Sequence, residues 1–150
     1  MGKIAVFKSS MFKVSDEIDP QTQMPPVPGK DWALYCRSLL AEQGLVFEGD
    51  EEPIESNGDW FMYASLGRMR VEVVAFWTVL GMTENDSWAV HVRILFPILK
   101  RLFGKADPRD ESFLIRLVDK ALQNEQEKGR ICDLRWLDAE EYSNLVSPQH

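Results

Sequence analysis

The sequence is poor in the side chains on which metal centres and disulfide frameworks depend. Its 150 residues include two cysteines, Cys36 and Cys132, and two histidines, His91 and His150. There is no CxxC or Cys/His pair, so the sequence indicates neither a zinc site nor a disulfide scaffold. We expect both cysteines to be buried thiols in a reducing compartment.

Other absences narrow the range of functions. No apolar run approaches the roughly 18 residues of a membrane span, and Lys8 and Lys13 interrupt the stretch in which a signal peptide would be apolar. The nine glycines form no phosphate-binding loop, and no GxSxG elbow occurs. We therefore expect a cytoplasmic protein without membrane contact, metal or cofactor, and we assign no catalytic residue. A non-enzymatic function is favoured over an enzymatic one.

Charge is unevenly distributed along the chain. The formal net charge of −7 argues against general affinity for nucleic acid. Residues 31–66 contain eight acidic residues and one basic residue, whereas residues 67–105 contain six basic and three acidic ones. An acidic surface of this kind is typical of proteins that meet a basic protein partner.

Length and composition predict one domain spanning residues 1–150. The hydrophobic fraction of 45% and the charged fraction of 27% are ordinary for a globular protein of this size. Four prolines between residues 9 and 29 predict a loop or extended arm there, either a surface connector or a functional segment.

The strongest structural signal is a strict alternation of apolar and polar residues between Trp60 and Phe96. It predicts three consecutive antiparallel strands over 60–66, 69–77 and 88–96. Asn57-Gly58 predicts a tight hairpin turn that adds a strand before them. Two further strands are expected at 3–7, as an edge or added strand, and at 130–137.

Helical spacing of apolar residues predicts four helices. The first begins at a capping Asp31 and ends at Gly44; a short one covers 98–103; the longest begins at Asp110 or Ser112. The last runs from a capping Asp138 to residue 146, with Glu141 completing a capping box. We predict an α+β fold in which a meander of about four strands, with N- and C-terminal strands added, carries helices on one face.

One set of polar residues shares a face of the predicted meander. Arg70, Glu72, His91 and Arg93 occupy the polar positions of their strands, with Tyr63 on the neighbouring strand. A carboxylate beside an imidazole suits general-base chemistry, and two guanidinium groups suit a bound carboxylate or phosphate. Ordinary cross-strand ion pairs on a wet sheet face are the simpler interpretation.

A second candidate is an acidic run between residues 48 and 59, which lacks the spacing of a calcium-binding loop. From it we select Glu51, Glu52 and Glu55 as candidate contacts with a partner. The hypothesis that the sequence favours is an acidic protein-interaction module of inhibitor, immunity or adaptor type. The alternatives are a small-ligand-binding or hydrolytic domain that uses the Arg/Glu/His set, and a homodimer.

Overall fold

The structure, a computed structural model, describes residues 3–14, 17–49, 52–80, 86–95 and 108–146. The elements within these ranges are β1 (Ile4–Lys8), α1 (Lys30–Glu42), β2 (Val46–Phe47), β3 (Ile54–Ser56), β4 (Asp59–Leu66), β5 (Met69–Val79), β6 (Asp86–Leu95), α3 (Pro108–Glu127), β7 (Cys132–Leu137) and α4 (Ala139–Val146). All strands pair in one antiparallel sheet, which confirms the α+β class. The short helix predicted at 98–103 lies outside the described residues.

The sheet has the order β2-β4-β5-β6-β1-β7, with β3 also paired to β4. The predicted meander is confirmed in β4, β5 and β6, where Val73 pairs with Met62 on one side and with Val92 on the other. Asn57 and Gly58 have positive φ values of 54° and 90°, as the predicted hairpin turn requires. β1 is not an edge strand, because β6 and β7 flank it. Its unbroken apolar run suits a strand covered on both faces.

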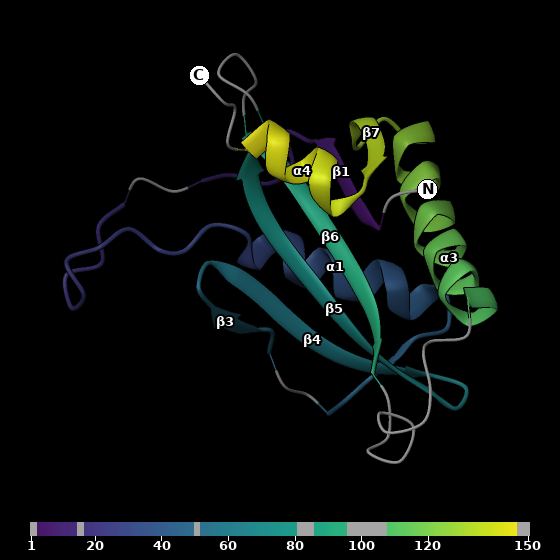
Figure 1. Cartoon of the computed structure of the whole chain (residues 1–150). Coiled ribbons are helices and arrows are strands. Elements are labelled where there is room, and N and C mark those ends of the chain that lie inside the picture. The colour runs from purple at the N-terminus through teal and green to yellow at the C-terminus, as the bar shows by residue number, and fades with distance from the viewer. Residues whose placement is uncertain (1–2, 15–16, 50–51, 81–85, 96–107, 147–150) are drawn as a thin grey trace.

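Two helices, α1 and α3, cover one face of the sheet, which we call the closed face (Figure 1). Trp32 on α1 is fully buried there, and its indole N–H donates a 2.7 Å hydrogen bond to the Ala89 carbonyl of β6. Phe7 meets the Trp32 ring edge-on at 4.8 Å. Phe12, at the start of the proline-containing segment, packs against the Trp32 and Trp88 rings. This end of the segment therefore belongs to the core.

The third described helix, α4, packs on the opposite face, which we call the open face (Figure 1). Tyr142 contacts the Phe76 ring at 5.8 Å, and its hydroxyl donates a 2.9 Å hydrogen bond to Thr78. The expectation that helices pack on one face thus applies to α1 and α3 and not to α4. The amphipathic pattern of α4 determines that it covers apolar residues, but does not determine on which side of the sheet they lie.

Local sequence signals predict the start of one helix correctly and the start of another incorrectly. Asp138 and Glu141 form the predicted capping box, with reciprocal hydrogen bonds of 3.2 and 2.7 Å. At the start of α1, the cap is Gly29 and not Asp31. Gly29 has a φ of 109°, and a Cβ there would lie 3.1 Å from the Trp60 ring, so a contact with β4 decides the boundary.

The two cysteines have different environments. Cys36 on α1 is buried, and burial raises the pKa of its thiol. Cys132, at the start of β7, is exposed, so the expectation of two buried thiols is wrong for this residue. Cys132 is the first residue of β7, which is the last strand on its side of the described sheet.

Candidate functional site

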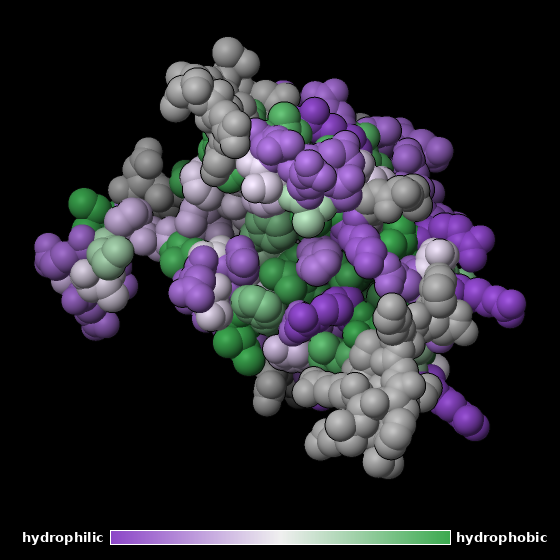
Figure 2. Space-filling view, viewed as in Figure 1, coloured by the Kyte–Doolittle hydropathy of each residue, from purple (hydrophilic) through white to green (hydrophobic). Residues whose placement is uncertain are grey.

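The pairing of strands brings the predicted Arg/Glu/His set together on the open face. Tyr63, Glu72 and Arg93 form one row across β4, β5 and β6. His91 lies in the next row, opposite Val74, and also pairs with Ile4 of β1. Figure 2 shows this face, where apolar and charged residues alternate below α4. The four predicted side chains and Tyr63 therefore occupy one continuous surface.

The centre of this surface is the carboxylate of Glu72. This residue is 8% exposed, and its Oε1 lies 2.8 Å from a guanidinium nitrogen of Arg93. The Tyr63 hydroxyl also forms a hydrogen bond with the Glu72 carboxylate. Burial is the largest cause that raises the pKa of Tyr63, and the negative charge and hydrogen bond of Glu72 raise it further. The carboxylate predicted to orient His91 is instead engaged by Arg93 and Tyr63.

Arg70 turns away from this pair toward the edge of the sheet. Its guanidinium forms two hydrogen bonds with Glu48, at 2.8 and 3.2 Å, and lies 5.5 Å from the centre of the Tyr63 ring. Hydrogen bonding to Arg70 lowers the pKa of Glu48. The sequence did not identify this pair, because it depends on the pairing of β2 with β4, and no periodic pattern predicts that pairing.

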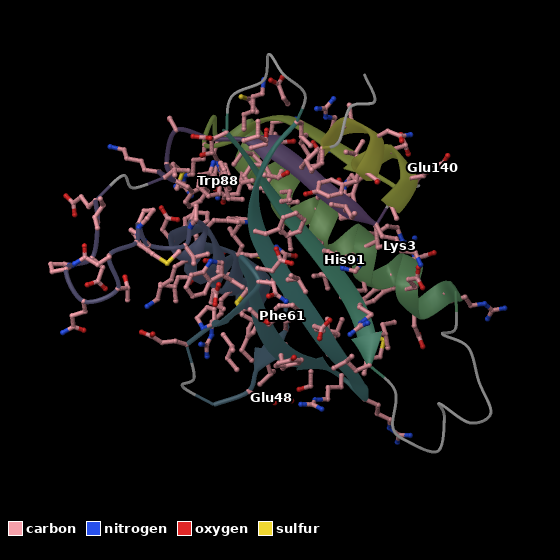
Figure 3. All side chains as sticks on the ribbon, turned by 60° about the vertical axis from the view of Figure 1, so that its left-hand side comes forward. Lys3, Glu48, Phe61, Trp88, His91 and Glu140 are labelled. Carbon is pink, nitrogen blue, oxygen red and sulfur yellow. The ribbon has the colours of Figure 1, made fainter. Side chains whose placement is uncertain are left out.

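His91 is half-buried between β1 and β5, and Figure 3 shows it beside Lys3. Burial, assisted by the positive charge of Arg93, lowers the pKa of the imidazole. Lys3 itself forms an ion pair with Glu111 of α3. The imidazole is therefore neutral at pH 7, and a neutral imidazole can accept a proton or a hydrogen bond.

Two of the three predicted acidic contacts, Glu52 and Glu55, lie at the edge of the sheet formed by β2 and β3. Glu52 and Glu55 are both exposed, whereas Glu51 lies outside the described residues. Glu52 forms a 3.1 Å ion pair with Lys30 of α1. Glu55 accepts a 3.2 Å hydrogen bond from the backbone of Gly58. These two acids therefore form a region separate from the Glu72–Arg93 pair.

The same edge exposes apolar side chains, which the sequence did not single out. Val46 on β2 is 67% exposed and Ile54 on β3 is 54% exposed, the former the most exposed of the large hydrophobic residues described. Between the two strands lies a hollow of about 20 Å³, lined by Arg37, Phe47, Glu48, Glu52, Ile54, Phe61, Met62 and Tyr63. Pockets for small molecules begin at about 300 Å³, so this hollow is too small for an organic ligand.

Neither a metal site nor a membrane-spanning helix is found among the residues that the structure describes. No group of three or more His, Cys, Asp and Glu side chains in these ranges has the geometry to hold a metal ion. None of the helices described is long and apolar enough to cross a membrane.

No family model, no curated protein and no solved structure matches the chain. A functional argument therefore depends on the surfaces described above.

Proposed function

We propose that this protein is a non-enzymatic interaction module whose β2–β3 edge binds a basic protein partner. The observation that carries the proposal is the exposure of Val46 and Ile54, at 67% and 54%, beside the acidic residues Glu48, Glu52 and Glu55. An apolar centre with a polar rim is the usual composition of a protein interface. Exposed acids on a short edge also protect a free protein from self-association.

The backbone of this edge supports the proposal. β2 and β3 are the last strands on their side of the described sheet, and each of them pairs with β4. An extended segment of a partner can add to such an edge through main-chain hydrogen bonds, while side-chain contacts give specificity.

Electrostatics at the edge favour a basic partner. Between residues 31 and 66, the stretch that includes β2 and β3, acidic residues outnumber basic ones eight to one. Two cations from outside this stretch, Lys30 and Arg70, form ion pairs at the edge with Glu52 and Glu48. The ion pair of Glu52 with Lys30 involves side chains that are 73% and 46% exposed. Such a pair contributes little to stability and can exchange one cation for another. Long-range attraction from the acidic surface would speed the encounter with the partner.

The charged rows of the open face support a ligand-binding or hydrolytic function less well. The Glu72 carboxylate already binds Arg93 and Tyr63, so it is not oriented toward His91 as a catalytic pair would require. A bound anion would have to break the Glu72–Arg93 pair and leave a nearly buried carboxylate without its cation.

The test is affinity capture from the host lysate with four forms of the purified protein. These are the wild type, Val46→Ser with Ile54→Ser, Glu52→Lys with Glu55→Lys, and a control, Glu127→Lys with Glu140→Lys. The control reverses two exposed acids on α3 and α4 and changes the net charge by the same amount. Thermal unfolding first establishes that all four forms are folded.

We expect a stoichiometric protein that is captured by the wild type and the control, weakened by both edge variants, and released by raised salt. Equal loss in the control and in the Glu52/Glu55 variant would show that overall charge, and not this edge, attracts the protein. If light scattering shows a dimer that the edge variants dissociate, the edge binds a second copy of this chain and not a basic partner. Either result, or no captured protein, contradicts the proposal.

A further inference from the structure

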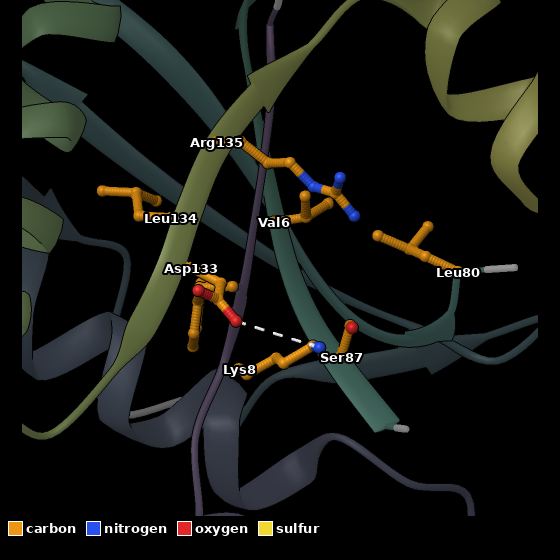
Figure 4. Close-up of a pocket in the computed structure, with 8 residues that line it drawn as sticks. Val6, Lys8, Leu80, Ser87, Asp133, Leu134 and Arg135 are labelled. Atoms are coloured by element: carbon orange, nitrogen blue, oxygen red, sulfur yellow. Dashed lines mark ion pairs between the residues drawn. The ribbon is translucent and has the colours of Figure 1, made fainter. Parts of the chain in front are cut away.

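Two features of the molecule lie outside the surfaces described above. One is a cavity of about 300 Å³ at β1 and β7, which contains the Lys8–Asp133 ion pair (Figure 4). Val6 and Leu80 in its lining are each 1% exposed, so these two side chains offer no apolar surface to a ligand. The other feature is a proline-containing segment between β1 and α1, residues 17–28, which we call the arm. It extends away from the sheet and the helices (Figure 1) and carries exposed apolar side chains.

The chain is held to the body of the protein on both sides of the arm. On the N-terminal side, Phe12 is 7% exposed and belongs to the core of the closed face. On the C-terminal side, the Trp60 indole N–H donates a 3.0 Å hydrogen bond to the Pro28 carbonyl. The backbone N–H of Lys13 donates a 3.3 Å hydrogen bond to the Asp31 carboxylate, which connects the two sides. The arm is therefore a loop with anchored ends and not a free tail.

Hydrogen bonds inside the arm form a turn at its tip. The Asp19 N–H donates a 3.0 Å hydrogen bond to the Met24 carbonyl, and the Gln23 N–H donates one of 2.8 Å to the Asp19 carbonyl. The Asp19 carboxylate accepts a further 2.8 Å hydrogen bond from the Gln21 N–H, as in an Asx turn. Ile18 and Met24, on either side of this turn, are 62% and 64% exposed. The turn thus holds two large apolar side chains in water.

The segment that follows the turn, Met24–Val27, is restricted to the polyproline II conformation. Proline fixes its own φ at about −65°, and the residue before a proline is confined to extended backbone. Pro25, Pro26 and Pro28 impose one or both of these restrictions on every residue of the segment. A polyproline II helix has three residues per turn. Met24 and Val27 therefore share one edge of this helix, and Pro25 and Pro28 share a second edge.

The surface of this segment is apolar and open to a partner. Val27 is 37% exposed, Pro25 and Pro26 are exposed, and Pro28 is half-buried. Grooves lined by aromatic side chains bind such segments, because a polyproline II helix is already ordered and loses little entropy on binding. The arm has two acidic residues and no basic one. Neither nucleic acid nor an anionic membrane would therefore be attracted to it.

We propose that Met24–Val27 is a preformed polyproline II ligand for an aromatic-lined groove on a protein partner. Met24, Pro25 and Val27 contact the rings of the groove, while Pro26, on the third edge of the helix, faces water. The proposal does not depend on the β2–β3 edge, because it involves other residues and is tested with other probes.

The test is an NMR titration of the ¹⁵N-labelled full chain with a panel of purified SH3 and WW domains, whose grooves are lined by aromatic residues. We expect at least one domain to cause saturable shifts of the Met24, Val27 and Gly29 amides. The amides of β2 and β3 should not shift, which separates this result from the outcome of the edge experiment. Thermal unfolding establishes that each variant used in the titration is folded.

Three variants separate the contacts from the preformed conformation. Met24→Ser with Val27→Ser removes the apolar edge and should raise the Kd about tenfold or more. Pro26→Ala removes no contact with the groove but relaxes the free segment, and should raise the Kd about twofold to fivefold. Pro20→Ala changes an exposed proline of the turn at the tip; it is the matched control and should leave the Kd unchanged.

Four results would overturn the proposal. The first is that no domain of the panel binds, and the second is an unchanged Kd for the Met24/Val27 variant. The third is an equal effect of Pro20→Ala and Pro26→Ala, which would show that the conformation of Met24–Val27 has no special role. The fourth is a dimer in light scattering that the Met24/Val27 variant dissociates, which would assign these side chains to contacts with a second copy of this chain.

Discussion

Side chains that alternate along β5 and β6 lie in two different environments. On the closed face, Val73 and Val90 are at most 1% exposed beneath α1 and α3. Those on the open face include the Glu72–Arg93 ion pair and half-buried His91, and α4 covers only the neighbouring part. The same strands therefore hold the fold together on one side and present polar groups on the other.

This difference assigns separate physical roles to the two faces. Burial of apolar area is the main favourable contribution to folding, and it is concentrated on the closed face. Ion pairs with exposed partners contribute little to stability. Substitutions that serve binding on the open face or at the sheet edge should therefore destabilise the fold only slightly. Variants matched across the two faces test this separation.

The largest effect is expected from an aromatic residue of the closed face. Trp32→Ala removes a fully buried ring and its hydrogen bond to Ala89, and should lower the free energy of unfolding by about 3–5 kcal/mol. Phe61→Ala removes a half-buried ring from the open face and should cost about 1 kcal/mol, because less apolar area returns to water. Urea denaturation measures both, and equal losses would contradict the separation of roles.

The second prediction compares two nearly buried carboxylates. Glu125 on α3 is 2% exposed; it accepts a 2.7 Å hydrogen bond from Tyr35 of α1 and lies 3.3 Å from Arg130. Glu125→Ala should cost about 2 kcal/mol, because it leaves the half-buried Tyr35 hydroxyl without its acceptor and removes a hydrogen bond between α1 and α3. Glu72→Ala on the open face should cost less, about 1 kcal/mol, since Arg93 is 60% exposed and returns to water.

The matched control is Glu125→Gln, which keeps an acceptor for the Tyr35 hydroxyl and should restore part of the loss. Urea denaturation of the three variants gives the order. If Glu72→Ala lowers the free energy of unfolding as much as Glu125→Ala or more, the open face contributes to stability as much as the contact between α1 and α3 does.

The division into two faces was readable from the sequence, because alternation with a period of two is a local property of each strand. It predicted β4, β5 and β6 and placed Glu72, His91 and Arg93 on one face. The Asn57-Gly58 turn and the capping box of α4 are local as well, and both are confirmed.

What the sequence did not predict depends on contacts between distant segments. The Arg70–Glu48 pair requires β2 to lie beside β4, and the cap of α1 at Gly29 requires contact with Trp60. The position of α4 on the open face depends on where β7 leaves the sheet. One missed feature did carry a signal: β1 has apolar residues at both parities, which is typical of an interior strand.

The smallest effect is expected from His91 and concerns pH. Burial and the nearby Arg93 charge hold the pKa of His91 below its usual value of 6.5, with Lys3 adding to this and Glu72 and Glu111 opposing it. Unfolding returns the imidazole to its usual pKa, so the unfolded chain binds more protons between the folded pKa and about 6.5. The part of the unfolding free energy that depends on His91 is therefore highest above about pH 6.5. It decreases as the pH falls and is constant below the folded pKa.

His91→Gln removes this dependence, and the difference in unfolding free energy between wild type and variant isolates it from the carboxylates that both proteins share. We expect the unfolding free energy of the wild type, relative to that of the variant, to decrease as the pH is lowered from about 8 to about 5. NMR titration gives the pKa directly, because the chain has one other histidine, His150, and the variant identifies the His91 signal. A pKa at or above 6.5, or a difference that does not change with pH, would show that the open face leaves His91 in contact with water.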